Sequence, residues 1–129
     1  TVNHDGTPYV TPIHFVYKDN TVYFHGLPDG QKIKNIKANK NVSIAVYNMD
    51  GLIMASVPDP CNVNTKYQSV IITGEAQVLE AMTEKETALK YLVEKHVPEL
   101  AGMDMSEAQI RGTAVVAVHC TVISGKYYG

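Results

Sequence analysis

The sequence has no tryptophan and only two cysteines, Cys61 and Cys120, among its 129 residues. The cysteines form no CxxC pair and no Cys/His set with zinc-ligand spacing, so neither a disulfide framework nor a structural metal is expected. No apolar run approaches the roughly 20 residues that span a bilayer, and no secretion signal opens the chain. We therefore expect a soluble cytoplasmic protein without a membrane partner.

The sequence also has no large excess of positive or negative charge. Lys and Arg number 11 and Asp and Glu number 13, which leaves a formal net charge of −2. Nucleic acid is not an expected partner, because a protein that binds its backbone normally carries a broad basic field. With 45% hydrophobic residues and no repeat or linker, residues 1–129 are expected to form a single domain. Because the chain starts at Thr1 rather than at a methionine, and soon enters a predicted strand, we expect further residues to precede it.

Strand patterns dominate the chain. Alternating runs of β-branched and aromatic residues predict strands at Pro8–Tyr17, Thr21–His25, Asn41–Tyr47, Tyr67–Leu79 and Thr113–Ile123. Residues 18–20 have turn chemistry, so the first two strands should form a hairpin. Pro12 predicts an edge or a bulge in the first strand, and Gly74 predicts a bulge or a bend in the fourth. Residues 48–64 are interpreted as a loop with room for a short strand.

Three segments carry helical signals. Ile33 and Ile36, separated by polar residues, predict a helix over Lys32–Asn39 that lays one apolar stripe on the sheet. Thr83–Glu86 matches a capping box, and apolar residues continue at helical spacing until Pro98. Residues 106–111 predict one further helical turn.

The junction between the second strand and the first helix has the features of an anion site. Tyr23 to Gly26 end the strand, and Gly30 and Lys32 open the helix. Free N–H groups and the positive end of the helix dipole meet at such a start, where one lysine completes a phosphate site without a metal. The alternative is that the lysines of this helix form a solvated face. The residues alone leave both interpretations open.

Strands in hairpins, short helices and no strand–helix alternation predict an α+β, mainly β fold: a small antiparallel barrel or half-open sheet with helices at its mouth. Five segments, in order over residues 8–126, resemble the FMN-binding split barrels related to pyridoxamine 5'-phosphate oxidase: Pro8–Tyr17, Tyr23–Gly26, Gly30–Lys32, Tyr67–Val70 and Gly74–Ala76. Within these proteins the chain most resembles the branch associated with 5-nitroimidazole resistance, in which a histidine at the place of His25 is characteristic. The resemblance implies a six-stranded antiparallel split β-barrel with flanking short helices.

The resemblance also implies a homodimer with two FMN molecules at the subunit interface, each contacted by both chains. Lys32 would meet the phosphate, and Gln68 and Ser69 would reach in from the partner subunit. The implied cofactor contacts are Thr11, Pro12, Ile13, Phe24, His25, Gly30, Gln31, Lys32, Gln68 and Ser69. His25 would also be the catalytic residue, since an imidazole ordinarily titrates near neutrality and can donate a proton there.

The function that the resemblance implies is an FMN-dependent oxidoreductase that reduces a small aromatic or nitro compound with electrons from an unidentified donor. Pyridoxamine phosphate is not the expected substrate, because residues 124–129 lack the Arg and Trp that hold it in the oxidases proper. One alternative is a flavin-storing or ligand-sensing module without turnover, since no acid/base pair or nicotinamide fingerprint is present. The other is a haem-binding split barrel with a histidine as axial ligand. His14, His96 and His119 lack metal-ligand spacing and are expected to be structural or surface residues.

Overall fold

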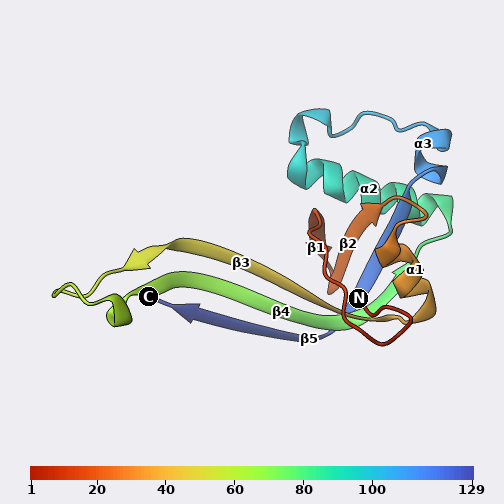
Figure 1. The fold of residues 1–129 in the computed structure, drawn as a ribbon. Coiled ribbons are helices and arrows are strands. Elements are labelled where there is room, and N and C mark those ends of the chain that lie inside the picture. The colour runs from red at the N-terminus through yellow and green to blue at the C-terminus, as the bar shows by residue number, and fades with distance from the viewer.

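Antiparallel strands make up most of the fold, and the computed structural model describes all of residues 1–129 (Figure 1). The strands are β1 (Phe15–Lys18), β2 (Thr21–Gly26), β3 (Asn41–Ile53), β4 (Asn64–Val78) and β5 (Ala114–Tyr128). They form one sheet in the order β1-β2-β5-β4-β3, curled into a half-barrel. The mainly β split-barrel fold is thus confirmed, whereas the expected number of six strands is wrong.

The first predicted strand is shorter than the sequence pattern indicates. Tyr9 does not join the sheet but exchanges two backbone hydrogen bonds of 2.8 Å with Thr1. Pro12 has no N–H to donate to a strand ladder. Regular pairing therefore begins only at Phe15, which lies opposite Phe24 on β2.

The turn between β1 and β2 confirms the predicted hairpin. Asp19 and Asn20 have φ angles of 50° and 60° and connect the paired residues Lys18 and Thr21. Two consecutive left-handed residues make a type I′ turn, whose twist matches that of the flanking strands. Asp and Asn tolerate this conformation better than most other residues.

All three predicted helices are present, but one predicted cap is not. The helices are α1 (Gln31–Ala38), α2 (Met82–His96) and α3 (Glu107–Arg111). The prediction of a capping box at Thr83 is wrong, because the N-cap of α2 is Ala81, two residues earlier, and Ala81 makes no side-chain hydrogen bond. A capping box is instead found at α3, between Ser106 and Gln109. None of the helices combines the length and the apolar character needed to cross a membrane.

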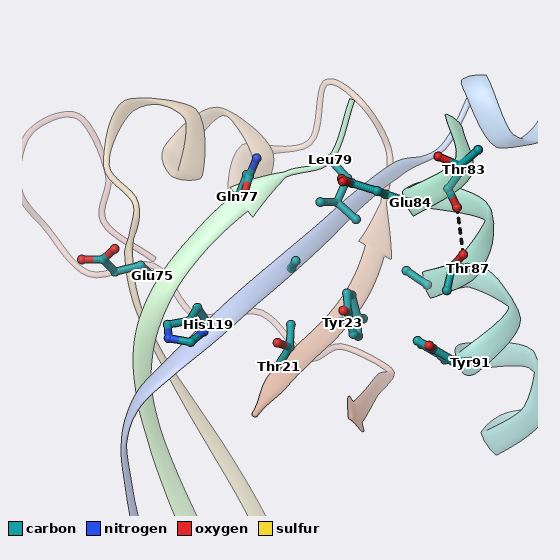
Figure 2. Close-up of a pocket in the computed structure, with 12 residues that line it drawn as sticks. Thr21, Tyr23, Glu75, Gln77, Leu79, Thr83, Glu84, Thr87, Tyr91 and His119 are labelled. Atoms are coloured by element: carbon teal, nitrogen blue, oxygen red, sulfur yellow. Dashed lines mark hydrogen bonds between the residues drawn. The ribbon is translucent and has the colours of Figure 1, made fainter. Parts of the chain in front are cut away.

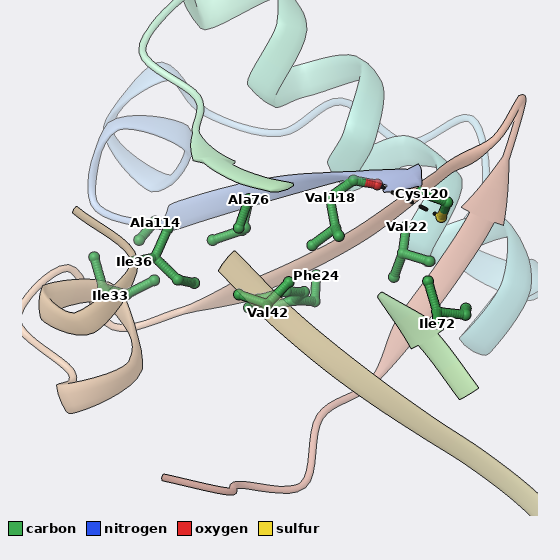
Figure 3. Packing of buried hydrophobic residues seen from close by; sticks show 11 residues of the cluster. Val22, Phe24, Ile33, Ile36, Val42, Ile72, Ala76, Ala114, Val118 and Cys120 are labelled. Carbon is green, nitrogen blue, oxygen red and sulfur yellow. Dashed lines mark hydrogen bonds between the residues drawn. The ribbon is translucent and has the colours of Figure 1, made fainter. Parts of the chain in front are cut away.

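Two hydrophobic clusters lie on opposite faces of the sheet. The first packs α1 against one face (Figure 3) and contains Val22, Phe24, Ile33, Ile36, Val42, Ile72, Ala76, Ala114, Val116, Val118 and Cys120. The second lies under α2 and α3 and contains Val16, Leu79, Ala88, Leu89, Leu92, Ile110 and Val115. Successive strand residues point to opposite faces, so Val115 and Val116 enter different clusters. Burial raises the pKa of the Cys120 thiol, which makes this side chain a packing residue rather than a nucleophile.

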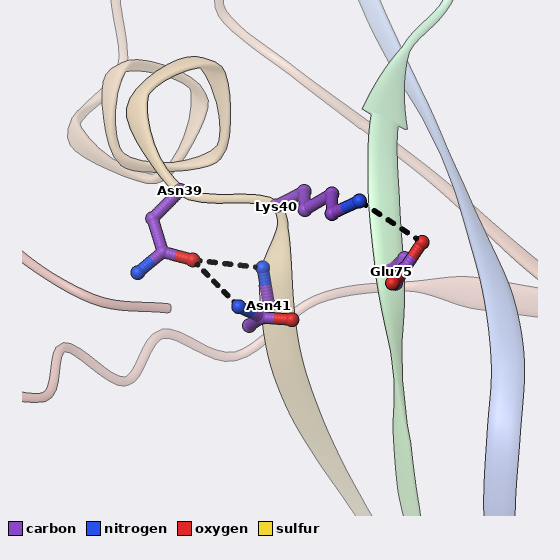
Figure 4. Close-up of polar contacts among 4 residues, drawn as sticks. All are labelled: Asn39, Lys40, Asn41 and Glu75. Atoms are coloured by element: carbon purple, nitrogen blue, oxygen red, sulfur yellow. Dashed lines mark hydrogen bonds and ion pairs between the residues drawn. The ribbon is translucent and has the colours of Figure 1, made fainter.

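A polar link carries the chain from α1 into β3 (Figure 4). The Asn39 side-chain oxygen accepts hydrogen bonds from the backbone and side chain of Asn41, at 3.0 and 3.1 Å. Lys40 Nζ lies 3.4 Å from Glu75 Oε2, and both side chains are more than half exposed, so this pair adds little stability. The Ala76 N–H also donates to the Lys40 carbonyl at 2.7 Å, which ties the end of the helix to β4.

The three longest strands leave the barrel together as an arm, defined here as residues 45–73 and 121–129 (Figure 1). β3 continues to Ile53 rather than ending at Tyr47, and β5 continues to Tyr128 rather than ending at Ile123. Large hydrophobic side chains are exposed along the arm and its tip: Tyr47, Met49, Leu52, Ile53, Met54, Val57, Ile71, Val122, Ile123, Tyr127 and Tyr128. The arm therefore has no hydrophobic core of its own within this chain.

Gly74 lies near the base of the arm. Thr73 pairs with Val122 whereas Gly74 pairs with Cys120, so Thr121 has no direct partner across the strands. The bulge predicted at this glycine is thus confirmed, and bulges of this kind bend a strand and increase its twist.

Candidate functional site

A cavity of about 710 Å³ opens where β2 ends and α1 begins. Residues of α2 and α3 close its other side. It is lined by His25, Gly26, Leu27, Lys32, Leu89, Met105, Gln109, Ile110, Gly112 and Thr113. Two residues predicted for the cofactor site, His25 and Lys32, are therefore brought together here from different elements.

Strand alternation in β2 decides which side chain enters this cavity. Phe24 is 4% exposed and packs in the cluster under α1. His25 consequently faces the opposite side of the sheet, toward α2 and α3, and lines the cavity. The two neighbours were both expected beside the flavin, but only the His25 side chain faces this cavity.

The start of α1 leaves hydrogen-bond donors free. The Gly30 N–H donates to the Leu27 carbonyl at 3.0 Å, which closes a turn between β2 and the helix. Gly30 is the N-cap and has no side chain to accept a bond. The N–H groups of Gln31 and Lys32 have no backbone acceptor. A helix start with free amides is a general binding site for anions.

The Gln31 side chain is committed elsewhere. Its Nε2 donates at 2.8 Å to Oδ1 of the buried Asn35. Asn35 in turn donates to Thr1 and Asn3, both at 3.0 Å, and so fixes the N-terminal segment on α1. Only the backbone of Gln31 is therefore available to an anion.

Lys32 differs from the other lysines of α1. It is half-buried, while Lys34 and Lys37 are exposed. No carboxylate lies within ion-pair distance of its ammonium group, and the side chain makes no hydrogen bond within the chain. A cation that is partly withdrawn from water without an acidic partner favours binding of an external anion over a purely solvated role.

Apart from Lys32 and His25, the polar side chains of the cavity already have partners. Gln109 belongs to the capping box of α3, and the Thr113 hydroxyl donates to the Gln109 carbonyl at 2.8 Å. The His25 imidazole makes no hydrogen bond within the chain, unlike that of His96, whose Nε2 lies 2.9 Å from the Phe15 carbonyl. The cavity thus offers two uncommitted polar side chains, His25 and Lys32, between apolar walls.

The other predicted site residues lie outside this cavity. Thr11 and Pro12 are in the irregular segment before β1, and Ile13 packs against the cluster under α1. Gln68 and Ser69 are neighbours on β4 in the arm, so their side chains point to opposite faces. Sequence reasoning did not assign Leu27, Met105 or Thr113 to the site, since no motif marks them.

A second cavity of about 500 Å³ lies between α2 and the same face of the sheet (Figure 2). Tyr23, Tyr91, Glu75 and His119 are among its residues. None of the predicted site residues lines it, and Glu75 is already paired with Lys40. No group of three or more His, Cys, Asp or Glu residues is arranged to hold a metal ion anywhere in the chain.

Comparison with solved structures shows the same fold in several proteins. A candidate 5-nitroimidazole antibiotic resistance protein from Bacteroides thetaiotaomicron is 27% identical, with 96% of this chain and 71% of that chain aligned at a TM-score of 0.83. The flavocytochrome Anf3 from Azotobacter vinelandii is 26% identical, with 99% and 59% aligned at 0.85. An FAD- and haem-binding protein from Mycobacterium smegmatis is 19% identical, with 98% and 62% aligned at 0.87, and this likeness shows the fold alone.

The chain spans less than two thirds of the last two proteins. No curated protein matches the chain by sequence. The family model described as pyridoxamine 5'-phosphate oxidase matches residues 1–127. The chain therefore belongs to the pyridoxamine 5'-phosphate oxidase family, whose split-barrel fold is the one described above.

Proposed function

We propose that this protein is an FMN-dependent oxidoreductase that reduces a small aromatic or nitro compound. The observation that carries the proposal is the half-buried Lys32, which has no acidic partner, lines one cavity with the uncommitted His25 and belongs to a helix start with two free amides. The likeness to a candidate 5-nitroimidazole resistance protein supports a nitro compound as the acceptor. The scarcity of cysteine supports a cytoplasmic location.

The residues at the start of α1 fit the phosphate of FMN. Lys32 would supply the positive charge, and the amides of Gln31 and Lys32 would supply neutral donors at the positive end of the helix dipole. When bound and reduced by an electron donor, FMN would supply the redox chemistry, the transfer of a hydride equivalent to the acceptor. Within this cavity Lys32 is the one lysine or arginine, so no second such residue is left for a phosphorylated substrate.

His25 would act on the acceptor rather than on the phosphate. Its imidazole has no partner within the chain and faces a cavity whose walls include Leu89, Met105 and Ile110. A flavin and a substrate that fill this cavity would displace water from the imidazole, and beside such apolar walls a hydrogen bond from the imidazole to a substrate oxygen would be stronger than in water. In this position His25 would orient the substrate and deliver a proton to the oxygen that gains charge.

The proposed enzyme is a homodimer in which the arm of one chain completes the site of the other. Apolar side chains are exposed on both faces of the arm, which is typical of a surface covered by a partner. A stable interface buries about 800 Å² on each subunit, and a long three-stranded arm can supply such an area. On this proposal Ser69 reaches the partner's flavin from the arm face that it shares with Tyr47 and Lys126.

Replacing Lys32 with Ala should weaken FMN binding roughly 10- to 100-fold, because a charge-assisted hydrogen bond contributes about 1.5–3 kcal/mol. Titration of flavin fluorescence measures this change. Lys34→Ala is the matched control, since Lys34 lies on the same helix but is exposed, and it should bind FMN like the wild type. Equal affinities in the two variants would remove Lys32 from the site.

Replacing His25 with Ala should leave FMN bound but lower the turnover of a nitroaromatic substrate by about 100-fold, the usual scale for the loss of a general acid. Steady-state reduction with an enzymatic flavin-reducing system as electron donor, corrected for the rate without this protein, measures the turnover. His119→Ala, in the second cavity, is the control and should keep full turnover. Wild-type protein that binds FMN but completes no repeated turnovers would favour the storage alternative.

A further inference from the structure

The Lys32 side chain lies against the backbone of Gly26. Gly26 ends β2, where it pairs with Ala114 on β5. A Cβ atom added to Gly26 would lie 2.9 Å from Lys32 Cε and 3.1 Å from Lys32 Nζ. The first distance is shorter than real contacts of a Cβ atom, so a side chain at position 26 and the observed position of Lys32 exclude one another.

The geometry of the helix start explains this contact. Side chains of a helix are inclined toward its N-terminus, and Lys32 is the second residue of α1. The turn closed by Leu27 and Gly30 brings the helix start back beside the end of β2. Lys32 therefore extends over the end of the preceding strand, where the absence of a Cβ leaves room for it.

We infer that Gly26 is a positioning residue for the proposed phosphate site: the bare backbone at position 26 holds the Lys32 ammonium group beside the free amides of α1. This inference rests on the proposed FMN site and adds a residue that sets the preference for a phosphorylated flavin. Alanine at position 26 would displace the flexible end of Lys32 at little cost to folding, because the atoms in the way belong to a movable side-chain tip.

The test compares FMN with riboflavin, which has the same ring system but no phosphate. Wild-type protein should prefer FMN, and Gly26→Ala should weaken FMN binding about tenfold while leaving riboflavin binding unchanged. A general disturbance of the cavity would weaken both ligands alike. In the Lys32→Ala background, Gly26→Ala should have no further effect on FMN, because the displaced group is already absent.

Thermal unfolding of the same four proteins covers the case in which Gly26→Ala does not fold. If the clash with Lys32 is the cause, Gly26→Ala/Lys32→Ala regains a cooperative unfolding transition, which supports the inference; continued loss of folding in the double variant overturns it. An unchanged FMN preference in folded Gly26→Ala also overturns it while leaving the proposed function standing. Wild-type protein that does not bind FMN would overturn both.

Discussion

Gly74→Ala is expected to lower the free energy of unfolding by about 3 kcal/mol, a size that point mutations reach only by a specific mechanism such as overpacking. A Cβ atom at this position would lie 2.4 Å from the His119 carbonyl oxygen and 2.8 Å from Val118 Cγ1. The obstructing oxygen belongs to the backbone of β5, which is paired with β2 on one side and β4 on the other. β4 and β5 therefore cannot move apart at Gly74 without breaking the hydrogen bonds between them.

Urea denaturation of Gly74→Ala and Gly125→Ala measures this effect. Gly125 also lies in the paired region of β4 and β5, but its added Cβ would meet only the Ser69 carbonyl, at an ordinary 3.8 Å. The control should therefore unfold close to the wild-type midpoint. Equal midpoints for the two variants would show that the bulge at Gly74 tolerates a side chain.

Ile71→Glu or Ile123→Glu is expected to convert the proposed dimer into monomers. Ile71 is 45% exposed and Ile123 is 48% exposed. Ile123 pairs with Ile72, the neighbour of Ile71 on β4, so the two positions sample opposite faces of the arm. A carboxylate buried without a partner costs several kcal/mol. The variant whose glutamate lies on the face that the partner covers should therefore dimerise with an association constant lower by roughly 100-fold or more.

Sedimentation velocity of the wild type and of the two variants measures this change, with flavin absorbance recorded in the same run. Val10→Glu is the control, because Val10 is 94% exposed and lies outside the arm. The affected variants should lose flavin together with the dimer, since the proposed site is completed by the partner. A wild-type monomer with full flavin binding would contradict the proposed assembly.

Several features of the fold were predictable because their causes are local. The type I′ turn at Asp19 and Asn20 follows from two residues that tolerate positive φ. The helix at residues 31–38 follows from the spacing of Ile33 and Ile36, both buried against the sheet. The bulge at Gly74 follows from a residue without a side chain inside a long strand pattern.

The candidate site was predictable only in part. The strand–glycine–lysine order placed His25 and Lys32 close together, and the structure does line one cavity with both. The sequence could not show that Phe24 turns into the core. Strand alternation reveals that neighbouring residues face opposite sides of a sheet, but not what covers each side. Thr83 gave a false capping signal because a four-residue pattern does not fix where a helix begins, and the N-cap of α2 is Ala81.

By itself the sequence determined the types of the elements, the hairpin turn and the lysine at the start of a helix. Each of these features depends only on residues that are close together in the sequence. Tertiary structure alone decided which lysine is half-buried, that five strands rather than six are formed, and that three of them extend as an exposed arm. These features depend on pairing between residues such as Val70 and Gly125. Contacts at such separations leave no periodic signal in either strand, because each partner satisfies the same alternating pattern in many registers.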